Sequence, residues 1–193
     1  MHTPLAPSSL TLLTHLYQLT MAYGYFKHGM TDKRAVFHLG FRKHPFSGGY
    51  TIAAGLAYVI DYLARFRFES DDLAYLATLT GSDDKPLFDD AFLRYLEQLS
   101  FSCHVDGVPE GTVVFPQEPL LRICGPVIQC QLIESALLNM INFQSLIATK
   151  AARVCSATGG DPVLEFGLRR AQGIDGSLAA SRAAYIGGCA ATS

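Results

Sequence analysis

The sequence predicts an α/β fold preceded by an α+β amino-terminal domain, and two observations support this. Near the carboxyl end, the apolar run Pro162–Phe166 predicts a buried strand, a polar loop follows, and the small-residue stretch Ser177–Ile186 predicts a helix. Earlier in the chain, short alternating apolar runs and amphipathic stretches follow one another, which is typical of strands mixed with helices. We therefore expect an α+β domain at 10–125, and a long helix with an α/β unit at 126–193.

The amino-terminal elements follow from their periodicity. Helices are expected at 12–27, 55–66, 71–79 and 88–99, and strands at 35–41 and 50–54. These two strands flank the basic turn Arg42–Gly49, and we interpret them as a hairpin. Turn residues then separate short strands at 101–105, 112–115 and 120–123, which predict a small antiparallel sheet. Pro126 opens a long helix at 127–153.

Composition bounds the class of protein. The chain has 193 residues, is 49% hydrophobic and 17% charged, and carries a net charge of -2 with no basic run. These values indicate a globular protein with a sizeable core and argue against a nucleic-acid partner. No apolar run reaches the roughly 20 residues of a membrane span, and residues 1–9 lack a signal core. The five cysteines are scattered without metal-binding spacing. We expect a cytoplasmic protein with free thiols and no membrane partner.

The loop after the strand at 162–166 carries the candidate site. Arg169 and Arg170 suit anions, because guanidinium is always charged and binds carboxylate or phosphate through two parallel hydrogen bonds. Gln172 and Asp175 follow, and Glu165 precedes them. The two carboxylates could coordinate magnesium, orient a sugar hydroxyl or pair with the arginines. From composition alone, an anion site and a surface with solvated arginines are equally open.

Three further residues are candidates for ligand contact. Tyr17 lies in an aromatic helix, where packing is the usual role and stacking on a flat ligand the alternative. Lys150 and Arg153 lie near the end of the long helix. Cations there either complement the helix dipole or contact an anion.

Common catalytic motifs are absent. The sequence contains no GxGxxG, no GxxxxGK[ST], no GxSxG and no HExxH. No metal-ligating set is predicted, and none of the six histidines is assigned a role.

Several stretches in order resemble the nicotinate phosphoribosyltransferase family over roughly residues 10–193. They are Leu12–Tyr25, Phe41–Phe46 with Gly48–Tyr50, Pro109–Gly111, Asn142–Arg153, Glu165–Gly173 and Ser181–Gly188. The ordered set is far more specific than any one stretch.

The resemblance implies an ATP-dependent enzyme of NAD salvage, a transferase that joins nicotinate to phosphoribosyl pyrophosphate (PRPP). Its products are nicotinate mononucleotide and pyrophosphate, and Mg²⁺ accompanies PRPP and ATP. It also implies the start of an irregular α/β barrel of the type II phosphoribosyltransferase kind, and a homodimer. Arg169 and Arg170 would serve as catalytic groups that hold phosphate or carboxylate. Tyr17 would stack on the pyridine ring. Weaker contacts would come from Glu165, Gln172, Asp175, Lys150 and Arg153.

Two departures from the family pattern shape the expectation. His15 stands where the family usually has Asp. A single clear barrel strand cannot bury both faces of an α/β core, so we expect an incomplete copy of a larger protein. The resemblance then implies that the family's phosphorylated histidine would lie beyond Ser193. The alternatives are a truncated, non-catalytic chain that only binds a partner subunit or ligand, and a related pyridine phosphoribosyltransferase using nicotinamide or quinolinate. We expect little catalytic activity from the isolated chain.

Overall fold

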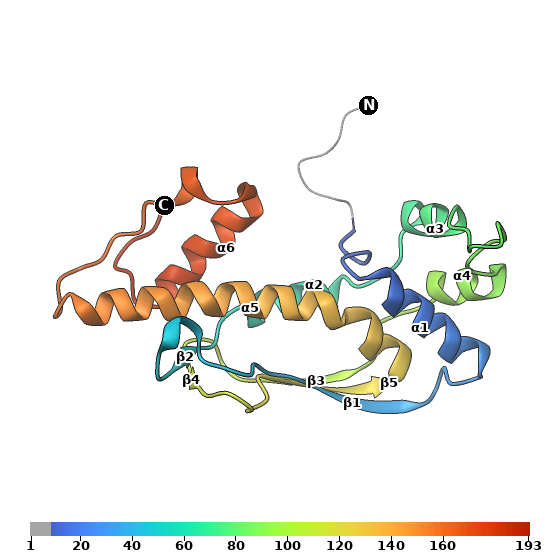
Figure 1. Ribbon diagram of the computed structural model, residues 1–193, viewed down its shortest axis with the longest axis horizontal. Helices are drawn as coiled ribbons and strands as arrows, with labels where there is room; N and C mark the ends of the chain where they lie inside the picture. The colour runs from blue at the N-terminus through green and yellow to red at the C-terminus, as the bar shows by residue number, and fades with distance from the viewer. Residues whose placement is uncertain (1–8) are drawn as a thin grey trace. The chain divides into compact units, whose positions relative to one another are not determined.

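The computed structural model describes residues 9–193 and shows a mixed fold of helices and short strands (Figure 1). The α-helices are α1 (Leu16–Lys27), α2 (Leu56–Ala64), α3 (Ser70–Ala77), α4 (Asp90–Glu97), α5 (Val127–Ala157) and α6 (Gly173–Ile186). The strands are β1 (Arg34–Leu39), β2 (Thr51–Ile52), β3 (His104–Gly107), β4 (Val113–Val114) and β5 (Leu121–Pro126). Short 3-10 helices are η1 (Pro45–Ser47) and η2 (Leu168–Arg170). Among residues 9–193, no helix is both long enough and apolar enough to cross a membrane.

The strands pair differently from the sequence prediction. One sheet has the order β1-β5-β3, and a second, two-stranded sheet joins β2 to β4 in antiparallel register, Thr51 opposite Val114 and Ile52 opposite Val113. The predicted hairpin of β1 and β2 is therefore wrong. So is the single sheet predicted for β3, β4 and β5. Turn composition marks where strands end, but long-range packing selects which strands pair.

The chain divides into two compact units that interleave along the sequence. The first comprises the chain up to Phe37, Ile60–His104 and Ile123–Ala136. The second comprises His38–Val59, Val105–Arg122 and Leu137–Ser193. This division follows compactness in space. The separation at residue 125, which the sequence pattern suggested, stays a prediction.

In the first unit, aromatic side chains form the core between α1 and α4. Phe92 is fully buried, and its ring lies 5.1 Å from that of Tyr23 and 5.4 Å from that of Phe26. Phe88 and Leu96 are buried beside it. Such tilted ring pairs are favourable beyond the area that they bury. The apolar face predicted for the helix near residues 88–99 therefore faces the core of this unit.

In the second unit, small residues bring α6 close to α5. Ala148 of α5 and Ala183 of α6 are fully buried in one cluster with Ile52 and Ala54. Gly187, just after α6, approaches the carbonyl of Ala148 so closely that a methyl group would not fit. Figure 1 shows α6 beside the carboxyl-terminal half of α5. Small side chains at such a contact let two helix backbones approach at high packing density.

Buried hydroxyls on α5 attach the segment that contains β2. Thr149 Oγ1 accepts a hydrogen bond from the Ile52 amide (2.9 Å), and Ser145 Oγ accepts one from the Ala54 amide (3.1 Å). Thr149 also donates to the carbonyl of Ser145 (2.6 Å). Polar residues on a buried helix face are therefore satisfied by backbone groups of a neighbouring segment, as buried polar groups must be.

The predicted strand at 162–166 forms only one bridge, a parallel contact between Leu164 and Ala191. Its side chains are not buried, since Leu164 is 52% exposed and Phe166 is 74% exposed. The prediction of a buried strand is wrong for this part of the chain. In the described residues no second sheet layer covers these side chains, and an apolar run alone cannot show whether one does.

Candidate functional site

The predicted anion-binding residues lie on one continuous segment of the second unit. Arg169 and Arg170 belong to η2, Gln172 caps the start of α6, and Asp175 lies in its first turn. All four side chains are exposed. Gly173 has a φ of +82°, a left-handed conformation that lets the chain turn sharply from η2 into α6. The fold therefore places two guanidinium groups next to a helix start in an accessible loop.

Glu165 supports this loop from within. Its carboxylate accepts hydrogen bonds from the Gly167 amide and from Ser181 Oγ (3.0 Å), and the Ser193 amide lies 3.4 Å away. Burial raises the pKa of Glu165, but the hydrogen bonds from Gly167, Ser193 and Ser181 outweigh it, so the pKa is lowered overall. The carboxylate is charged and occupied by protein donors. Its role as a ribose or metal contact stays a prediction.

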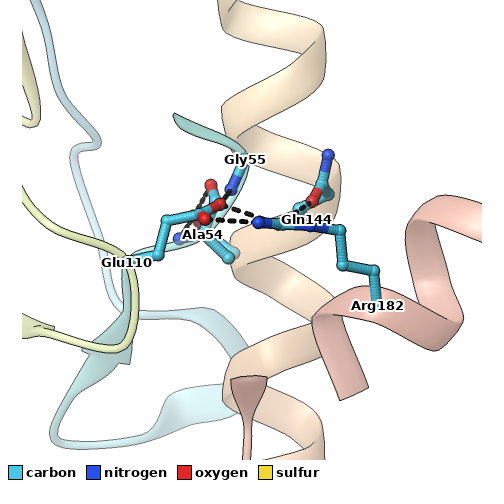
Figure 2. A network of polar contacts seen from close by, with 6 residues as sticks. Ala54, Gly55, Glu110, Gln144 and Arg182 are labelled. Atoms are coloured by element: carbon cyan, nitrogen blue, oxygen red, sulfur yellow. Dashed lines mark hydrogen bonds and ion pairs between the residues drawn. The ribbon is translucent and has the colours of Figure 1, made fainter. Parts of the chain in front are cut away.

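A second polar cluster, which we call the clamp, consists of Gly55, Glu110, Gln144 and Arg182 in the same unit (Figure 2). Arg182 binds the Glu110 carboxylate through both terminal nitrogens, at 2.8 Å from Oε1 and 2.5 Å from Oε2. The Gly55 amide donates to Glu110 Oε1 (2.6 Å), and Arg182 Nη1 also donates to Gln144 Oε1 (3.2 Å). The clamp thereby joins the start of α2, the 109–111 turn, α5 and α6.

Electrostatics favour the charged form of both ion-pair partners. The hydrogen bond from Arg182 lowers the pKa of Glu110, with a further contribution from the Gly55 amide. The same bond raises the pKa of Arg182. The Glu110 side chain is 18% exposed and that of Arg182 is 33% exposed. The Arg182 guanidinium also lies 5.8 Å from the ring centre of Tyr58. Two parallel bonds in a partly desolvated setting fix orientation more strongly than a single surface contact.

Backbone geometry explains why the clamp includes a glycine. Gly55 has a φ of +102°, which residues with a side chain rarely adopt. A Cβ atom there would lie 2.6 Å from the carbonyl oxygen of Met140. Only glycine lets the chain pass α5 this closely while its amide points at Glu110.

Lys150 and Arg153 both contact the η1 turn. Lys150 Nζ lies 5.0 Å above the ring centre of Phe46, and Arg153 Nη1 donates to the Phe46 carbonyl (2.8 Å). Phe46 and Ser47 have φ values of 58° and 53°, so this turn has an unfavourable backbone that the contacts help to hold. Anion contact by these cations stays a prediction.

Tyr17 lies in the first unit and is 53% exposed. Its ring stacks on that of His15 with centres 5.5 Å apart and an angle of 24° between planes. His15 Nδ1 lies 2.7 Å from Ser135 Oγ, which donates to Gln18 Oε1 (2.7 Å). The His15 imidazole therefore takes part in orienting the exposed tyrosine.

The predicted site residues are distributed over both units. Tyr17 lies in the first unit, and all the others lie in the second.

Sequence reasoning assigned no role to Glu110, Gln144 or Arg182. The signals available were a glutamate between Pro109 and Gly111 in a turn, and one arginine in an otherwise small-residue helix. Neither indicates a partner 72 residues away. Within residues 9–193, no group of three or more His, Cys, Asp or Glu side chains is arranged to hold a metal ion.

Comparison with known proteins decides the family. Residues 12–142 match the model of the nicotinate phosphoribosyltransferase (NAPRTase) N-terminal domain. The chain belongs to the nicotinate phosphoribosyltransferase family. The resemblance found in the ordered sequence stretches is thereby confirmed.

Curated relatives of the nicotinate phosphoribosyltransferase family support the same assignment. Nicotinate phosphoribosyltransferase of Caenorhabditis elegans is 47% identical over 184 residues, which cover 94% of this chain and 32% of that protein. The Bacillus subtilis (strain 168) enzyme is 45% identical over 185 residues, 96% of this chain and 36% of its own length. The chain thus spans about a third of the length of these relatives.

Solved structures agree in fold. The crystal structure of human nicotinic acid phosphoribosyltransferase matches with a TM-score of 0.85 and 43% identity, over 94% of this chain and 36% of that one. A nicotinate-nucleotide pyrophosphorylase from Pyrococcus furiosus matches with a TM-score of 0.70 at 23% identity, covering all of this chain and 41% of that one, and shows a shared fold alone. The mixed helix and strand fold is therefore that of nicotinate phosphoribosyltransferases.

Proposed function

We propose that this chain carries a substrate-binding part of a nicotinate phosphoribosyltransferase, which transfers the phosphoribosyl group of PRPP to nicotinate and releases pyrophosphate. The observation that carries the proposal is the likeness to proteins named nicotinate phosphoribosyltransferase, at 45–47% identity over more than nine-tenths of this chain. The exposed arginine pair at the start of α6 supports it, because both substrates are anions.

The reaction needs positioning and charge stabilisation more than proton transfer. The pyridine nitrogen of nicotinate has a free lone pair at neutral pH and attacks the ribose carbon as the bond to pyrophosphate breaks. Negative charge then grows on the leaving group, and positive charge grows on the ribose ring. Fixed cations near the leaving group lower this barrier, since they need no reorganisation during reaction.

The residues of this chain take roles that follow from that chemistry. Arg169 and Arg170 bind phosphate oxygens of PRPP or the nicotinate carboxylate, and Tyr17 presents its ring to the pyridine. Gln172 contributes a hydrogen bond to the ribose or phosphate. Lys150 and Arg153 act at longer range, because both already hold the η1 turn.

Magnesium fits as a companion of the substrate phosphates. Mg²⁺ keeps several waters and is commonly bound by one or two carboxylates together with phosphate oxygens. Asp175 is the exposed carboxylate closest in sequence to the arginine pair and would supply such a ligand. When bound, the ion neutralises charge on the departing pyrophosphate. ATP coupling, a homodimer and a cytoplasmic location belong to the same proposal, and no residue of this chain is assigned to ATP.

Calorimetric titration of Mg²⁺–PRPP into the purified chain tests the proposal. We expect saturable binding that weakens at least tenfold in Arg169→Ala, which is about 1.4 kcal/mol of binding free energy. Arg67→Ala is the matched control, because Arg67 is an exposed arginine of the first unit. Absence of PRPP binding by the unaltered chain would overturn the proposal.

Product formation in the same preparation separates the remaining alternatives. Nicotinate, PRPP, ATP and Mg²⁺ are supplied, and nicotinate mononucleotide is measured. Turnover would show that this chain completes the reaction by itself. Binding without turnover would restrict it to the substrate-binding role. Preference for nicotinamide or quinolinate over nicotinate would favour a related pyridine phosphoribosyltransferase.

A further inference from the structure

The clamp lies outside the predicted anion-binding loop but acts on the same helix. Arg182 is in the second half of α6, and its guanidinium is directed at Glu110 and Gln144 (Figure 2). These partners belong to the 109–111 turn and to α5. One side chain of α6 is therefore attached to two separate segments of the second unit.

The residue before Arg182 attaches α6 to the loop. Ser181 Oγ donates to Glu165 Oε2 (3.0 Å), and the same carboxylate accepts the Gly167 amide through Oε1. Successive residues of a helix point about 100° apart, because a turn contains about 3.6 residues. Ser181 and Arg182 thus project in different directions, one to the loop and one to the clamp.

A continuous set of contacts follows from these two attachments. It runs from the Gly55 amide through Glu110 and Arg182 into α6, and from Ser181 through Glu165 to Gly167. Gly167 caps the start of η2, the turn that contains Arg169 and Arg170. Any rotation or sliding of α6 would move Ser181, and with it the carboxylate that holds this turn.

The hydrogen bonds of the clamp fix the position of the Arg182 guanidinium. Glu110 accepts hydrogen bonds from both terminal nitrogens of Arg182 and from backbone amides at the start of α2, including that of Gly55, and its charge is matched by the Arg182 guanidinium. Bidentate geometry restricts the angle as well as the distance between the partners. Gln144 is 1% exposed, so it holds the guanidinium from a rigid, buried point on α5.

We propose that Glu110 and Arg182 are positioning residues, which set the orientation of α6 and thereby place Arg169 and Arg170 for anion binding. This inference rests on the proposed function for its consequence in PRPP binding. The structural part of the proposal is that this pair controls the loop, and it rests on the contacts alone.

Hydrogen exchange detected by mass spectrometry tests the structural content. In Glu110→Gln the side-chain shape is kept and the charge is lost. We expect exchange in the 165–172 segment to become at least tenfold faster, with the α1 and α4 segments of the first unit unchanged. Arg182→Lys, which keeps the charge but loses the second parallel bond, should give a smaller change in the same segment.

Lys27→Gln is the matched control, because it breaks an exposed ion pair of the first unit. It should leave exchange in the 165–172 segment at the rate of the unaltered chain. If amide exchange becomes faster by the same factor in all segments of the Glu110→Gln and Arg182→Lys chains, the substitutions destabilise the whole protein. That result would overturn the proposal. So would an unchanged rate at 165–172 in both variants.

Titration with Mg²⁺–PRPP tests the functional consequence. We expect Glu110→Gln to weaken binding about tenfold and Arg182→Lys to restore part of the affinity relative to Arg182→Ala. If the unaltered chain binds no PRPP, the proposed function fails, while the exchange experiment still decides whether the clamp controls the loop. If the exchange rises locally but PRPP affinity is unchanged, the positioning role is refuted and the proposed function stands.

Discussion

The two compact units each contain an ion pair of short contact distance, and the surroundings of these pairs differ. In the second unit, Arg182 and Glu110 approach to 2.5 Å with side chains 33% and 18% exposed. In the first, Lys27 and Asp89 approach to 2.8 Å with side chains 53% and 37% exposed. The distances are alike, so distance alone cannot rank the two pairs.

Neighbouring hydrogen bonds make the difference. Glu110 is also bound by the Gly55 amide, and Arg182 also reaches Gln144, so removing one partner leaves a desolvated group without its charge complement. Lys27 bonds Asp89 and lies 5.8 Å from the ring centre of Tyr23, but its side chain is 53% exposed, so water can replace the bond to Asp89. Asp89 still has a structural role without Lys27, because its Oδ1 accepts a hydrogen bond from the Phe92 amide (2.9 Å) and caps α4. Both pairs join segments that are distant in sequence, 62 residues apart for Lys27 and Asp89 and 72 residues apart for Glu110 and Arg182. The pair in the second unit is also bonded to Gln144 of α5 and to the Gly55 amide.

The largest effect is expected from Gly55→Ala, which breaks the clamp through the backbone. The φ of +102° and the carbonyl of Met140 at 2.6 Å from a Cβ leave no room for a methyl group. We expect a loss of about 3 kcal/mol in the free energy of unfolding, measured in urea. Gly49→Ala is the control, since Gly49 has open space around it. Equal stability of these two variants would show that the backbone at Gly55 is not restrictive.

Glu110→Ala is expected to cost less, about 2 kcal/mol, because it leaves Arg182 with only Gln144 and the ring of Tyr58. Urea unfolding of this variant beside Glu97→Ala, an exposed glutamate of α4, measures the difference. If Glu110→Ala lowers the free energy of unfolding no more than Glu97→Ala does, the clamp stabilises the protein no more than a surface contact. The two ion pairs would then not differ in their contribution to stability.

A pH series sharpens the comparison further. The bond from Arg182 lowers the pKa of Glu110 in the folded chain. Its contribution to stability is therefore fully present above the pKa of an unfolded glutamate, about 4.3, and is lost as pH falls below that value toward the folded pKa. The stability difference between the unaltered chain and Glu110→Gln should be constant from pH 6 to 8 and shrink below about pH 4.3. If the stability difference between the two chains grows as the pH falls, the pKa of Glu110 is not lowered by folding.

Lys27→Ala should give the smallest effect, with a melting temperature that is indistinguishable from that of the unaltered chain. An exposed ion pair gains little because water screens both charges. Asp89 retains its cap on α4 in this variant. Differential scanning calorimetry at low and at moderate salt checks this expectation. A drop as large as that of Glu110→Ala would erase the distinction between the two ion pairs.

Local elements of this fold were largely predictable. The long helix was expected at 127–153 and is observed at Val127–Ala157, because a proline precedes an apolar stretch without a breaker. The helix expected at 88–99 is observed at Asp90–Glu97, where Asp89 supplies the cap. Strand pairing was not predictable. β2 is two residues long, and its partner β4 lies about sixty residues further along the chain.

In the candidate site, too, local sequence patterns were predictable and long-range contacts were not. Arg169 and Arg170 could be singled out because two adjacent arginines between glycines, directly before a helix, form a local pattern. Glu165 was also singled out, but its carboxylate is engaged by Gly167 and Ser181. Such an assignment depends on what surrounds an acidic group in three dimensions, which spacing in the sequence does not contain.

By itself, the sequence determined the family, through ordered stretches that resemble nicotinate phosphoribosyltransferases, and it determined where most helices form. Both depend on residues that are neighbours in the chain. Only the tertiary structure decided that Glu110 and Arg182, 72 residues apart, form one ion pair. The physical reason is that a charged group specifies no partner until packing has removed water from around it and brought one complementary group within hydrogen-bond distance.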